Sequence, residues 1–382
     1  MSEISTTILH TGYNPKDHRG AIVPPIHLSS TFEFGNSDGY DYSRSGNPTR
    51  KTLEQVLAKL DGADYGLAFS SGSAVLATVA AILKSGEKIL FSSDAYGGTY
   101  RYVTGVLANQ GVGYAITDFT DLKTVETVLA DDPTIRLIWV ETPTNPLLKV
   151  ADISELASIA HANGAILVVD NTFATPALQR PLEHGADIVA YSTTKYINGH
   201  SDSVGGSLAT SDTELFKRLE FLQNAIGAVL SPFDSWLTLR GLKTLELRIE
   251  RHVSNAGQIA RLLKASPKVK RVYYPELFTG SQGDIVKKQM AGGGGIISVE
   301  IDDKYDVQTF LRNLEYFPLA ESLGAVESLI DHPASMTHAA IPPEERAKIG
   351  LSDGLFRISV GIENPGDLLF DIEKALNLLD YK

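Results

Sequence analysis

A single lysine stands where the sequence predicts the end of a buried strand. Residues 188–191 form a short apolar run, and the hydroxyl residues 192–194 connect this run to Lys195. A lysine in such a place is costly unless its charge is paired or its amine is chemically occupied. Lysine amines condense with carbonyl groups, and neighbouring hydroxyls suit a phosphate. The combination suggests pyridoxal phosphate (PLP), an aldehyde that carries a phosphate. This stretch alone is equally compatible with a solvated lysine on a surface loop.

A carboxylate earlier in the chain favours PLP. The apolar run 165–169 ends in Asp170, which precedes Lys195 by 25 positions (195 − 170). A continuous apolar run of this kind indicates a central parallel strand, whose carboxyl end lies at the ligand-binding edge of the sheet. We therefore expect Asp170 and Lys195 on the same edge. PLP needs an acid at its pyridine nitrogen, so the pair is more specific than either residue alone.

The elements that must position these residues alternate along the chain. The predicted strands are 65–69, 88–91, 112–116, 135–140, 165–170 and 188–191, and the predicted helices are 47–60, 74–83, 99–108, 122–129, 153–162 and 213–224. Such alternation predicts a mostly parallel sheet with helices on both faces. The turn that contains Gly72 joins a strand to a helix N-terminus, which is an arrangement that binds phosphate. Tyr96 and Asn145 follow strands and are expected on the same edge as Asp170.

The second half of the chain predicts another domain. A long helical pattern, 236–263, follows the break at residues 231–232 and connects to α+β structure, with strands 272–274, 296–301 and 355–360 and a last helix, 365–379. We therefore expect a PLP-binding α/β domain over residues 46–233 and a smaller C-terminal α+β domain over residues 234–382. Residues 1–45 show little periodicity and are expected to form an irregular arm, whose first ~15 residues read equally well as a flexible tail.

Composition excludes several classes of protein. The net charge of −12 argues against nucleic acid and acidic membrane surfaces as partners. No apolar run reaches the ~20 residues that a membrane span requires, and residues 1–10 lack the basic and apolar segments of a signal peptide, so we expect none. The absence of cysteine fits a cytoplasmic protein and removes thiolate metal ligands. The nine histidines lack a metal-ligand spacing, so we expect no metal site.

The sequence disfavours two other functions. A nicotinamide-dependent dehydrogenase requires Gly-x-Gly-x-x-Gly between a strand and a helix, whereas Gly111-Val112-Gly113 lacks the third glycine and precedes a strand. A non-catalytic binding protein on the same fold is disfavoured because a lysine, an acid, an aromatic ring and an arginine suited to PLP chemistry occur together.

The chain resembles the Cys/Met-metabolism PLP enzymes, a family that includes cystathionine γ-lyase, β-lyase and γ-synthase and methionine γ-lyase. The matching motifs run in order across nearly the whole chain: residues 41–50 (DYSRSGNPTR), 70–72 (SSG), 96–98 (YGG), 169–172 (VDNT), 192–196 (STTKY) and 357–361 (RISVG). The resemblance implies the type I PLP aminotransferase-like fold. It also implies a homo-oligomer, expected to be a homotetramer, in which the N-terminal arm embraces a neighbouring subunit.

The resemblance further implies roles for individual residues. Lys195 would form the Schiff base with PLP and act as the catalytic base, and Asp170 would pair with the pyridine nitrogen. Tyr96 would stack on the ring and assist catalysis. The remaining cofactor contacts would come from Gly72, Ser73, Thr172, Ser192 and Thr194, and from Tyr42 and Arg44 of an adjacent subunit. The substrate α-carboxylate would be held by Asn145, Ser322 and Arg357. A surface ion pair is the alternative expectation for Arg357.

Members of the family catalyse different reactions. The resemblance favours the α,γ-elimination of cystathionine, with release of sulfide as a side activity. Asp41, Arg101 and Glu321 stand where relatives that handle cystathionine place charged residues for its distal amino acid group, although each could be an ordinary surface charge. Residues 42–50 and 319–324 look most like γ-lyases, while some γ-synthases and β-lyases share much of both. Methionine γ-lyases usually carry cysteine at the position of Gly98, which makes that activity less favoured.

Overall fold

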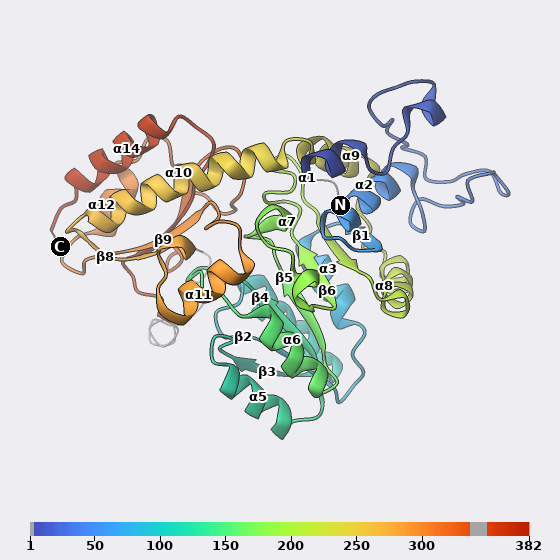
Figure 1. The fold of residues 1–382 in the computed structure, drawn as a ribbon, viewed down its shortest axis with the longest axis horizontal. Helices are drawn as coiled ribbons and strands as arrows, with labels where there is room; N and C mark the ends of the chain where they lie inside the picture. The colour runs from blue at the N-terminus through green and yellow to red at the C-terminus, as the bar shows by residue number, and fades with distance from the viewer. Residues whose placement is uncertain (1–3, 337–349, 382) are drawn as a thin grey trace.

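A seven-stranded sheet forms the centre of the N-terminal part of the chain (Figure 1). The computed structural model describes residues 4–336 and 350–381. The strands are β1 (Tyr65–Phe69), β2 (Lys88–Ser92), β3 (Gly113–Thr117), β4 (Ile135–Glu141), β5 (Ile166–Asp170), β6 (Ile188–Tyr191) and β7 (Gly206–Thr210), in the spatial order β1-β7-β6-β5-β4-β2-β3. Strand β7 pairs antiparallel with β1 and with β6, whereas the other strand pairs of this sheet are parallel. The predicted mostly parallel sheet is therefore confirmed.

Helices cover both faces of this sheet, as the sequence pattern predicted. They include α2 (Pro48–Leu60), α3 (Gly72–Ala80), α4 (Gly97–Tyr102), α5 (Leu122–Asp131), α6 (Ile153–Ala162), α7 (Thr175–Leu178) and α8 (Thr213–Ile226). One buried apolar cluster lies between the sheet and α3, and a second lies between the opposite face and helices α5 and α6. The alternation of short apolar strands and amphipathic helices produces these two layers because each element must bury its apolar face.

A four-stranded antiparallel sheet forms the C-terminal part, in the order β10-β11-β9-β8. Its strands are β8 (Val269–Tyr273), β9 (Ile296–Ile301), β10 (Leu329–Asp331) and β11 (Leu355–Ser359), and its helices are α11 (Gly280–Gln289), α12 (Val307–Arg312) and α14 (Pro365–Asn377). The expected α+β arrangement is confirmed, although α11, α12 and β10 were not predicted. Among the described residues, no helix has both the length and the apolar character that crossing a bilayer requires.

The single long helix expected over residues 236–263 is wrong. The segment forms two helices, α9 (Pro232–Leu242) and α10 (Leu245–Ala265). At the junction the Thr244 N–H donates to the Gly241 carbonyl at 3.2 Å, a contact one residue shorter than an α-helical bond. The Arg248 Nη2 donates to the same carbonyl at 2.9 Å. A side chain from the next helix thus satisfies the end of α9, and periodicity alone does not reveal such a contact.

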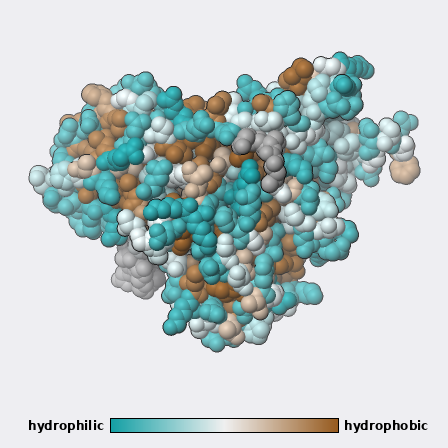
Figure 2. All heavy atoms as spheres, viewed as in Figure 1, coloured by the Kyte–Doolittle hydropathy of each residue, from teal (hydrophilic) through white to brown (hydrophobic). Residues whose placement is uncertain are grey.

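The described part of the N-terminal arm begins with a helix. Helix α1 (Ile4–His10) buries Ile4 and Ile8 and packs against α2, so a flexible tail is the wrong interpretation for residues 4–10. The arm then runs irregularly and projects from the body in Figure 1. Three of its apolar side chains, Ile22, Leu28 and Phe34, are 76%, 73% and 96% exposed. The face shown in Figure 2 is otherwise largely hydrophilic, with hydrophobic residues scattered over it.

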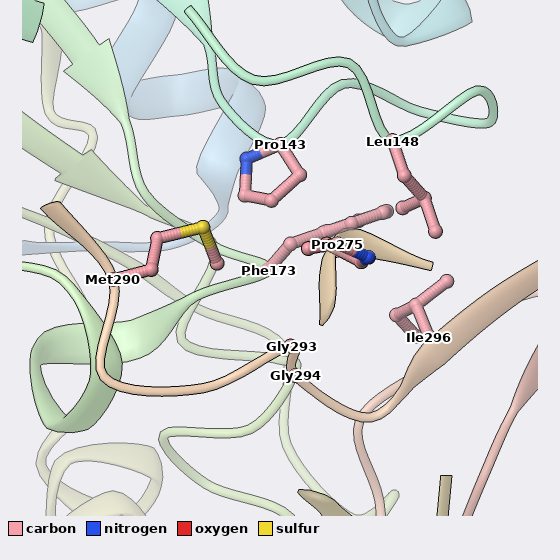
Figure 3. Close-up of a pocket in the computed structure, with 8 residues that line it drawn as sticks. All are labelled: Pro143, Leu148, Phe173, Pro275, Met290, Gly293, Gly294 and Ile296. Atoms are coloured by element: carbon pink, nitrogen blue, oxygen red, sulfur yellow. The ribbon is translucent and has the colours of Figure 1, made fainter. Parts of the chain in front are cut away.

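The two parts of the chain pack directly against each other around a small apolar cavity of roughly 10 Å³ (Figure 3). It is lined by Pro143, Leu148, Phe173, Pro275, Met290, Gly293, Gly294 and Ile296. A Cβ on Gly293 would lie 2.6 Å from the Tyr274 ring, so this contact requires glycine. The space holds at most about one water molecule, and the chemistry must take place elsewhere.

Candidate functional site

Lys195 lies just beyond the carboxyl end of β6, as predicted. Its Nζ donates to the Ser322 Oγ at 2.8 Å, a contact that joins residues 127 positions apart. Burial, and secondarily the nearby Arg357 guanidinium, lower the pKa of Lys195 to about 8. A substantial fraction of the amine is therefore neutral near pH 8, which is the form that attacks carbonyls and accepts protons.

Asp170 ends the neighbouring strand β5, on the same edge of the sheet. Its Oδ1 accepts from the Thr172 N–H at 3.0 Å and from the Thr172 hydroxyl at 2.5 Å. The Thr172 hydroxyl also accepts from the Ser192 N–H at 2.9 Å, which ties the carboxylate to the segment that leads to Lys195. Burial raises the pKa of Asp170 in the free chain. A cationic partner at its other oxygen, such as a protonated pyridine nitrogen, would compensate this desolvation.

Glu141 is a site residue that the sequence analysis missed. It ends β4 and lies directly opposite Asp170 in the parallel pairing of β4 with β5. Its carboxylate accepts from the Tyr96 N–H at 2.8 Å and from the Thr99 hydroxyl at 2.9 Å. Burial and, next, the adjacent Asp170 raise the pKa of Glu141 to about 8. Its position at the end of an apolar strand, like that of Asp170, was the signal available in the sequence.

The turn between β1 and α3 approaches the segment before Lys195. A Cβ on Gly72 would lie 3.0 Å from the Ser192 Cβ, so only glycine allows this approach without displacement. The Ser71 hydroxyl caps α3 by accepting from the Ala74 N–H at 3.0 Å. The first N–H groups of α3, including those of Gly72 and Ser73, have no partner within the helix. The turn and Ser192 thus make a cradle with the size and donors that a phosphate needs.

The predicted phosphate contact Thr194 is already engaged. Its hydroxyl donates to the Gly205 carbonyl at 3.2 Å and accepts from the Gly205 N–H at 3.0 Å. These bonds hold the Lys195 segment against the start of β7.

Tyr96 begins α4 and leaves about half of its surface exposed, at 48%. Glu141 fixes its backbone, as described above, and the ring is left to contact a ligand. A Cβ on Gly98 would lie 2.4 Å from the Tyr96 Cε1, so any side chain at position 98 would displace the ring. Position 98 therefore sets the orientation of Tyr96.

Arg357 comes from β11, yet it reaches both parts of the chain. It is buried, and its Nη1 donates to the Asn145 Oδ1 at 2.8 Å while its Nη2 donates to the Ser322 carbonyl at 3.1 Å. Ser322 has a φ of 95°, in the left-handed region that side chains disfavour. The structure thus brings together the three residues predicted to hold a carboxylate.

Arg357 also forms an ion pair with Asp331, a buried residue that faces it from β10 and that the sequence analysis did not identify. Burial raises the pKa of Asp331, and the guanidinium opposes this shift. The Arg357 Nε is buried and has no hydrogen-bond partner among the residues that the structure describes. An unpartnered cationic donor in a buried site suits an incoming carboxylate. The expected alternative, a surface ion pair, is wrong because both partners are buried.

A buried polar network runs beneath the site. The Tyr191 hydroxyl donates to the Asp61 Oδ1 at 2.5 Å and accepts from the Asn171 amide at 3.0 Å. Asn171 exchanges hydrogen bonds with Gln179, and the Gln179 Oε1 accepts from the Gln289 amide at 2.9 Å. Since Gln289 lies on α11, the network connects the large sheet with the C-terminal part.

The remaining predicted residues lie on the surface of the single chain. Tyr42 is 47% exposed, and the exposed Arg44 donates from Nε to the Asn224 Oδ1 of α8 at 3.2 Å. Asp41, Arg101 and Glu321 are also exposed. Of these three, Glu321 lies near enough to Lys195 to oppose the lowering of its pKa. The structure does not gather the five residues into one cluster within the chain.

Comparison with known proteins gives a consistent result. The chain is 51% identical to a cystathionine γ-lyase of Dictyostelium discoideum over 381 residues, covering 98% of each chain. It is 49% identical to a cystathionine β-lyase of Lactococcus lactis over 379 residues, covering 98% of this chain and 99% of the relative. Proteins named for different reactions are thus almost equally similar to it.

Solved structures agree. A cystathionine γ-lyase of Lactobacillus plantarum complexed with L-serine has a TM-score of 0.96 at 42% identity and covers 100% of both chains. A cystathionine γ-synthase of Xanthomonas oryzae has a TM-score of 0.94 at 44% identity, covering 99% of this chain and 98% of the other. These likenesses confirm the expected fold of PLP-dependent trans-sulfuration enzymes.

A family model described as "Cys/Met metabolism PLP-dependent enzyme" matches residues 5–377, nearly the full length of the chain. The cofactor of this family is PLP, in agreement with the chemistry expected from Lys195 and Asp170. The chain therefore belongs to the Cys/Met-metabolism family of PLP-dependent enzymes.

Proposed function

We propose that this enzyme catalyses the α,γ-elimination of L-cystathionine to L-cysteine, 2-oxobutyrate and ammonia. The observation that carries the proposal is the convergence of Lys195, Ser322 and Arg357, which places a base of lowered pKa next to a buried carboxylate-binding donor. An α-amino acid bound there by its carboxylate would present its Cα proton to the lysine. Release of sulfide from cysteine or homocysteine is the expected side activity.

The residues of the site fit PLP. The cradle at Gly72, Ser73 and Ser192 would hold the phosphate, with Thr194 supporting the segment behind it. Asp170 would hold the pyridine nitrogen, with Thr172 orienting its carboxylate, and the Tyr96 ring would stack on the cofactor. When bound, PLP supplies an electron sink for the carbanion that forms next to the substrate amine.

Lys195 would act twice as a base. It would first remove the Cα proton, give that proton up, and then, neutral again, remove a Cβ proton, because elimination from the γ position requires the negative charge to reach Cβ. Burial keeps part of the amine neutral near pH 8, which matches this role. Tyr96 would assist the departure of the cysteine thiolate.

Arg357 would bind the substrate α-carboxylate. Its buried Nε is the free donor, and the Asn145 amide, whose oxygen is already held by the guanidinium, would supply a second donor through Nδ2. Two donors of fixed geometry suit a planar carboxylate. The carboxylate would then lie beside Ser322, whose hydroxyl contacts Lys195.

The choice of α,γ-elimination rests on finer features. Asp41, Arg101 and Glu321 carry charges suited to the distal amino acid group of cystathionine, the carboxylates to its ammonium and the guanidinium to its carboxylate. Glycine at position 98 leaves room for the Tyr96 ring, whereas cysteine, usual in methionine γ-lyases, would displace it. The relatives named β-lyase and γ-synthase make those reactions the alternatives.

The enzyme is also proposed to be a homotetramer of two dimers. Tyr42 and Arg44, exposed in the single chain, would reach the phosphate of a neighbouring subunit's PLP. The exposed apolar side chains of the arm support this assembly, since burial against another chain would remove them from water. Fully active monomers in sedimentation would contradict it.

Product analysis with L-cystathionine tests the proposed reaction. We expect cysteine and 2-oxobutyrate in equal amounts. Homocysteine and pyruvate as main products would show a β-lyase. Efficient formation of cystathionine from cysteine and an O-acylated homoserine, with negligible cleavage, would show a γ-synthase.

A further inference from the structure

A buried ion pair on α2 lies outside every role assigned above. Arg50 and Glu54 are 3% and 6% exposed, and the Arg50 Nε lies 3.5 Å from the Glu54 Oε1. Burial lowers the pKa of Arg50 and raises the pKa of Glu54, while each charge opposes the shift of the other. Buried ion pairs are often no more stabilising than apolar residues of similar size. The contacts of the pair are therefore more informative about its role than its contribution to the stability of the protein.

Arg50 holds the loop that carries Tyr42 and Arg44. Its Nη1 donates to the Ser43 carbonyl at 2.8 Å, and its Nη2 donates to the Arg44 carbonyl at 3.1 Å. One planar guanidinium thus fixes two successive peptide groups. A lysine ammonium is a point charge without this fork and cannot hold both carbonyls and the carboxylate in the same geometry.

Glu54 connects the same arginine to the strand before the phosphate cradle. Its Oε1 accepts from the Ala68 N–H of β1 at 3.1 Å. The helix is seated tightly on this strand, since a Cβ on Gly66 would lie 2.5 Å from the Glu54 carbonyl oxygen. Strand β1 leads directly into the turn at Gly72. The loop at residues 42–44 is thereby held in a fixed relation to a rigid element of its own chain.

We propose that Arg50, anchored by Glu54, is a positioning residue that presents Tyr42 and Arg44 to the PLP phosphate of the neighbouring subunit. The inference rests on the proposed cross-subunit role of this loop. Arg50 touches neither substrate nor cofactor in this scheme. It acts through the backbone carbonyls of Ser43 and Arg44. The loss of Arg50 should therefore weaken PLP binding in the partner's site.

The rate of PLP loss after dilution into PLP-free buffer, followed by the visible absorbance of the bound cofactor, measures the effect. We expect Arg50→Ala to lose PLP at least about tenfold faster than wild type and Arg50→Lys to lie between them. Once both loop contacts are removed by Tyr42→Phe together with Arg44→Ala, the addition of Arg50→Ala should accelerate the loss no further. Lys288→Met is the matched control, because Lys288 pairs with Asp152 at 2.8 Å between α6 and α11. It should leave the rate unchanged. Unchanged PLP loss in both Arg50 variants would overturn the inference.

Hybrid assemblies separate this inference from the proposed function. Each variant is co-expressed with Lys195→Ala under a different affinity tag, and doubly tagged assemblies are purified. Only a site that has Lys195 gives the absorbance, and in a mixed dimer that site takes its loop from the Lys195→Ala chain, where Arg50 and Arg44 are intact. Doubly tagged tetramers also include unmixed variant dimers, whose sites lose PLP at the rate of the variant alone and add a separate fast phase.

We expect a phase of slow, wild-type PLP loss, absent from either variant alone, in the doubly tagged assemblies of both Arg44→Ala and Arg50→Ala. Recovery of slow PLP loss with Arg44→Ala but not with Arg50→Ala would support the cross-subunit role of the loop and overturn the role of Arg50. Recovery with neither would refute the cross-subunit role of the loop, and the inference would fall with it. Arg50→Lys replaces Arg50→Ala in the same hybrids if the alanine variant does not fold.

Discussion

The two sides of the site are built differently. On the cofactor side, Asp170, Glu141 and the cradle at Gly72 lie at the carboxyl ends of strands of one sheet or in the turns that follow them. On the carboxylate side, Asn145, Ser322 and Arg357 come from three segments that converge only when the two parts of the chain pack together. The first side follows from the local order of strands and turns, and the second depends on tertiary packing.

This difference suggests that the two sides can be damaged separately. The cofactor side is tied to the large sheet by short-range bonds, such as those of Thr172 to Asp170. The carboxylate side depends on one guanidinium, that of Arg357. Variants on one side should therefore change PLP retention or substrate affinity, but not both, while Lys195 belongs to both sides.

Lys195→Ala should have the largest effect. Alanine offers neither the amine that binds PLP nor the base, so turnover should fall by more than about 10³-fold with the fold retained. Cystathionine turnover, visible absorbance and circular dichroism measure this. Lys217→Ala, at an exposed position on α8, is the control. Substantial residual turnover would show that another group is the catalytic base.

Arg357→Lys should damage the carboxylate side alone. The charge remains, but the fork that binds Asn145, Ser322 and the substrate is lost, so KM for cystathionine should rise by about 10- to 100-fold. PLP loss should stay at the wild-type rate. Arg312→Lys, at an exposed position, is the control. A changed rate of PLP loss with an unchanged KM would break the separation of the two sides.

Glu141→Gln should damage the cofactor side alone, and more mildly. Above the Glu141 pKa of about 8 the carboxylate accepts from both groups, whereas glutamine keeps one oxygen for the Tyr96 N–H or the Thr99 hydroxyl and loses the other acceptor, at a cost of about 1–3 kcal/mol. PLP loss should accelerate by up to about tenfold, with KM little changed. The exposed Glu155→Gln provides the comparison. Wild-type PLP loss would remove Glu141 from the cofactor side.

Asp61→Asn should leave turnover nearly unchanged and alter the pH dependence of stability. Burial raises the pKa of Asp61 from 3.8 to about 7, so the folded chain holds a proton that the unfolded chain releases between these pH values. The wild type should therefore lose stability as pH rises from about 4 to 7, by a few kcal/mol at most, and the variant should lack this contribution. Urea unfolding at several pH values measures it.

The exposed Asp64→Asn is the control for that series. Identical pH profiles for Asp61→Asn and wild type would mean that Asp61 is ionised in the folded chain at all these values. The polar network that connects the large sheet with the C-terminal part would then carry a full buried charge.

The sequence predicted the cofactor side better than the carboxylate side for a physical reason. Apolar strands followed by Asp170 or by Lys195 leave a local pattern, and the parallel sheet brings such residues to one edge. Arg357 was expected to bind a carboxylate only through family resemblance. Its partner Asp331 ends a three-residue strand, β10, that is too short to leave a periodic pattern.

The helix features that the sequence did not predict also depend on tertiary contacts. Helix α11 contains two glycines, Gly280 and Gly283, and six polar or charged residues in its sequence GSQGDIVKKQ, so its helical periodicity is weak. Its position is set by tertiary bonds, such as that from the Gln282 Nε2 to the Val150 carbonyl at 2.7 Å. The division between the α9 and α10 helices likewise depends on Arg248 and not on a proline or glycine turn.

The buried pair of Arg357 and Asp331 also determines how the site responds to salt. Because Asp331 already balances the guanidinium, a substrate carboxylate approaches a pair with little net charge. Its affinity then comes from oriented donors and not from long-range attraction, which salt would screen within about 10 Å at 0.1 M. Simple anions such as chloride are therefore only weakly attracted to the Arg357 pair. KM for a substrate that lacks the distal amino acid group, such as homocysteine, should stay nearly flat between about 50 and 500 mM KCl.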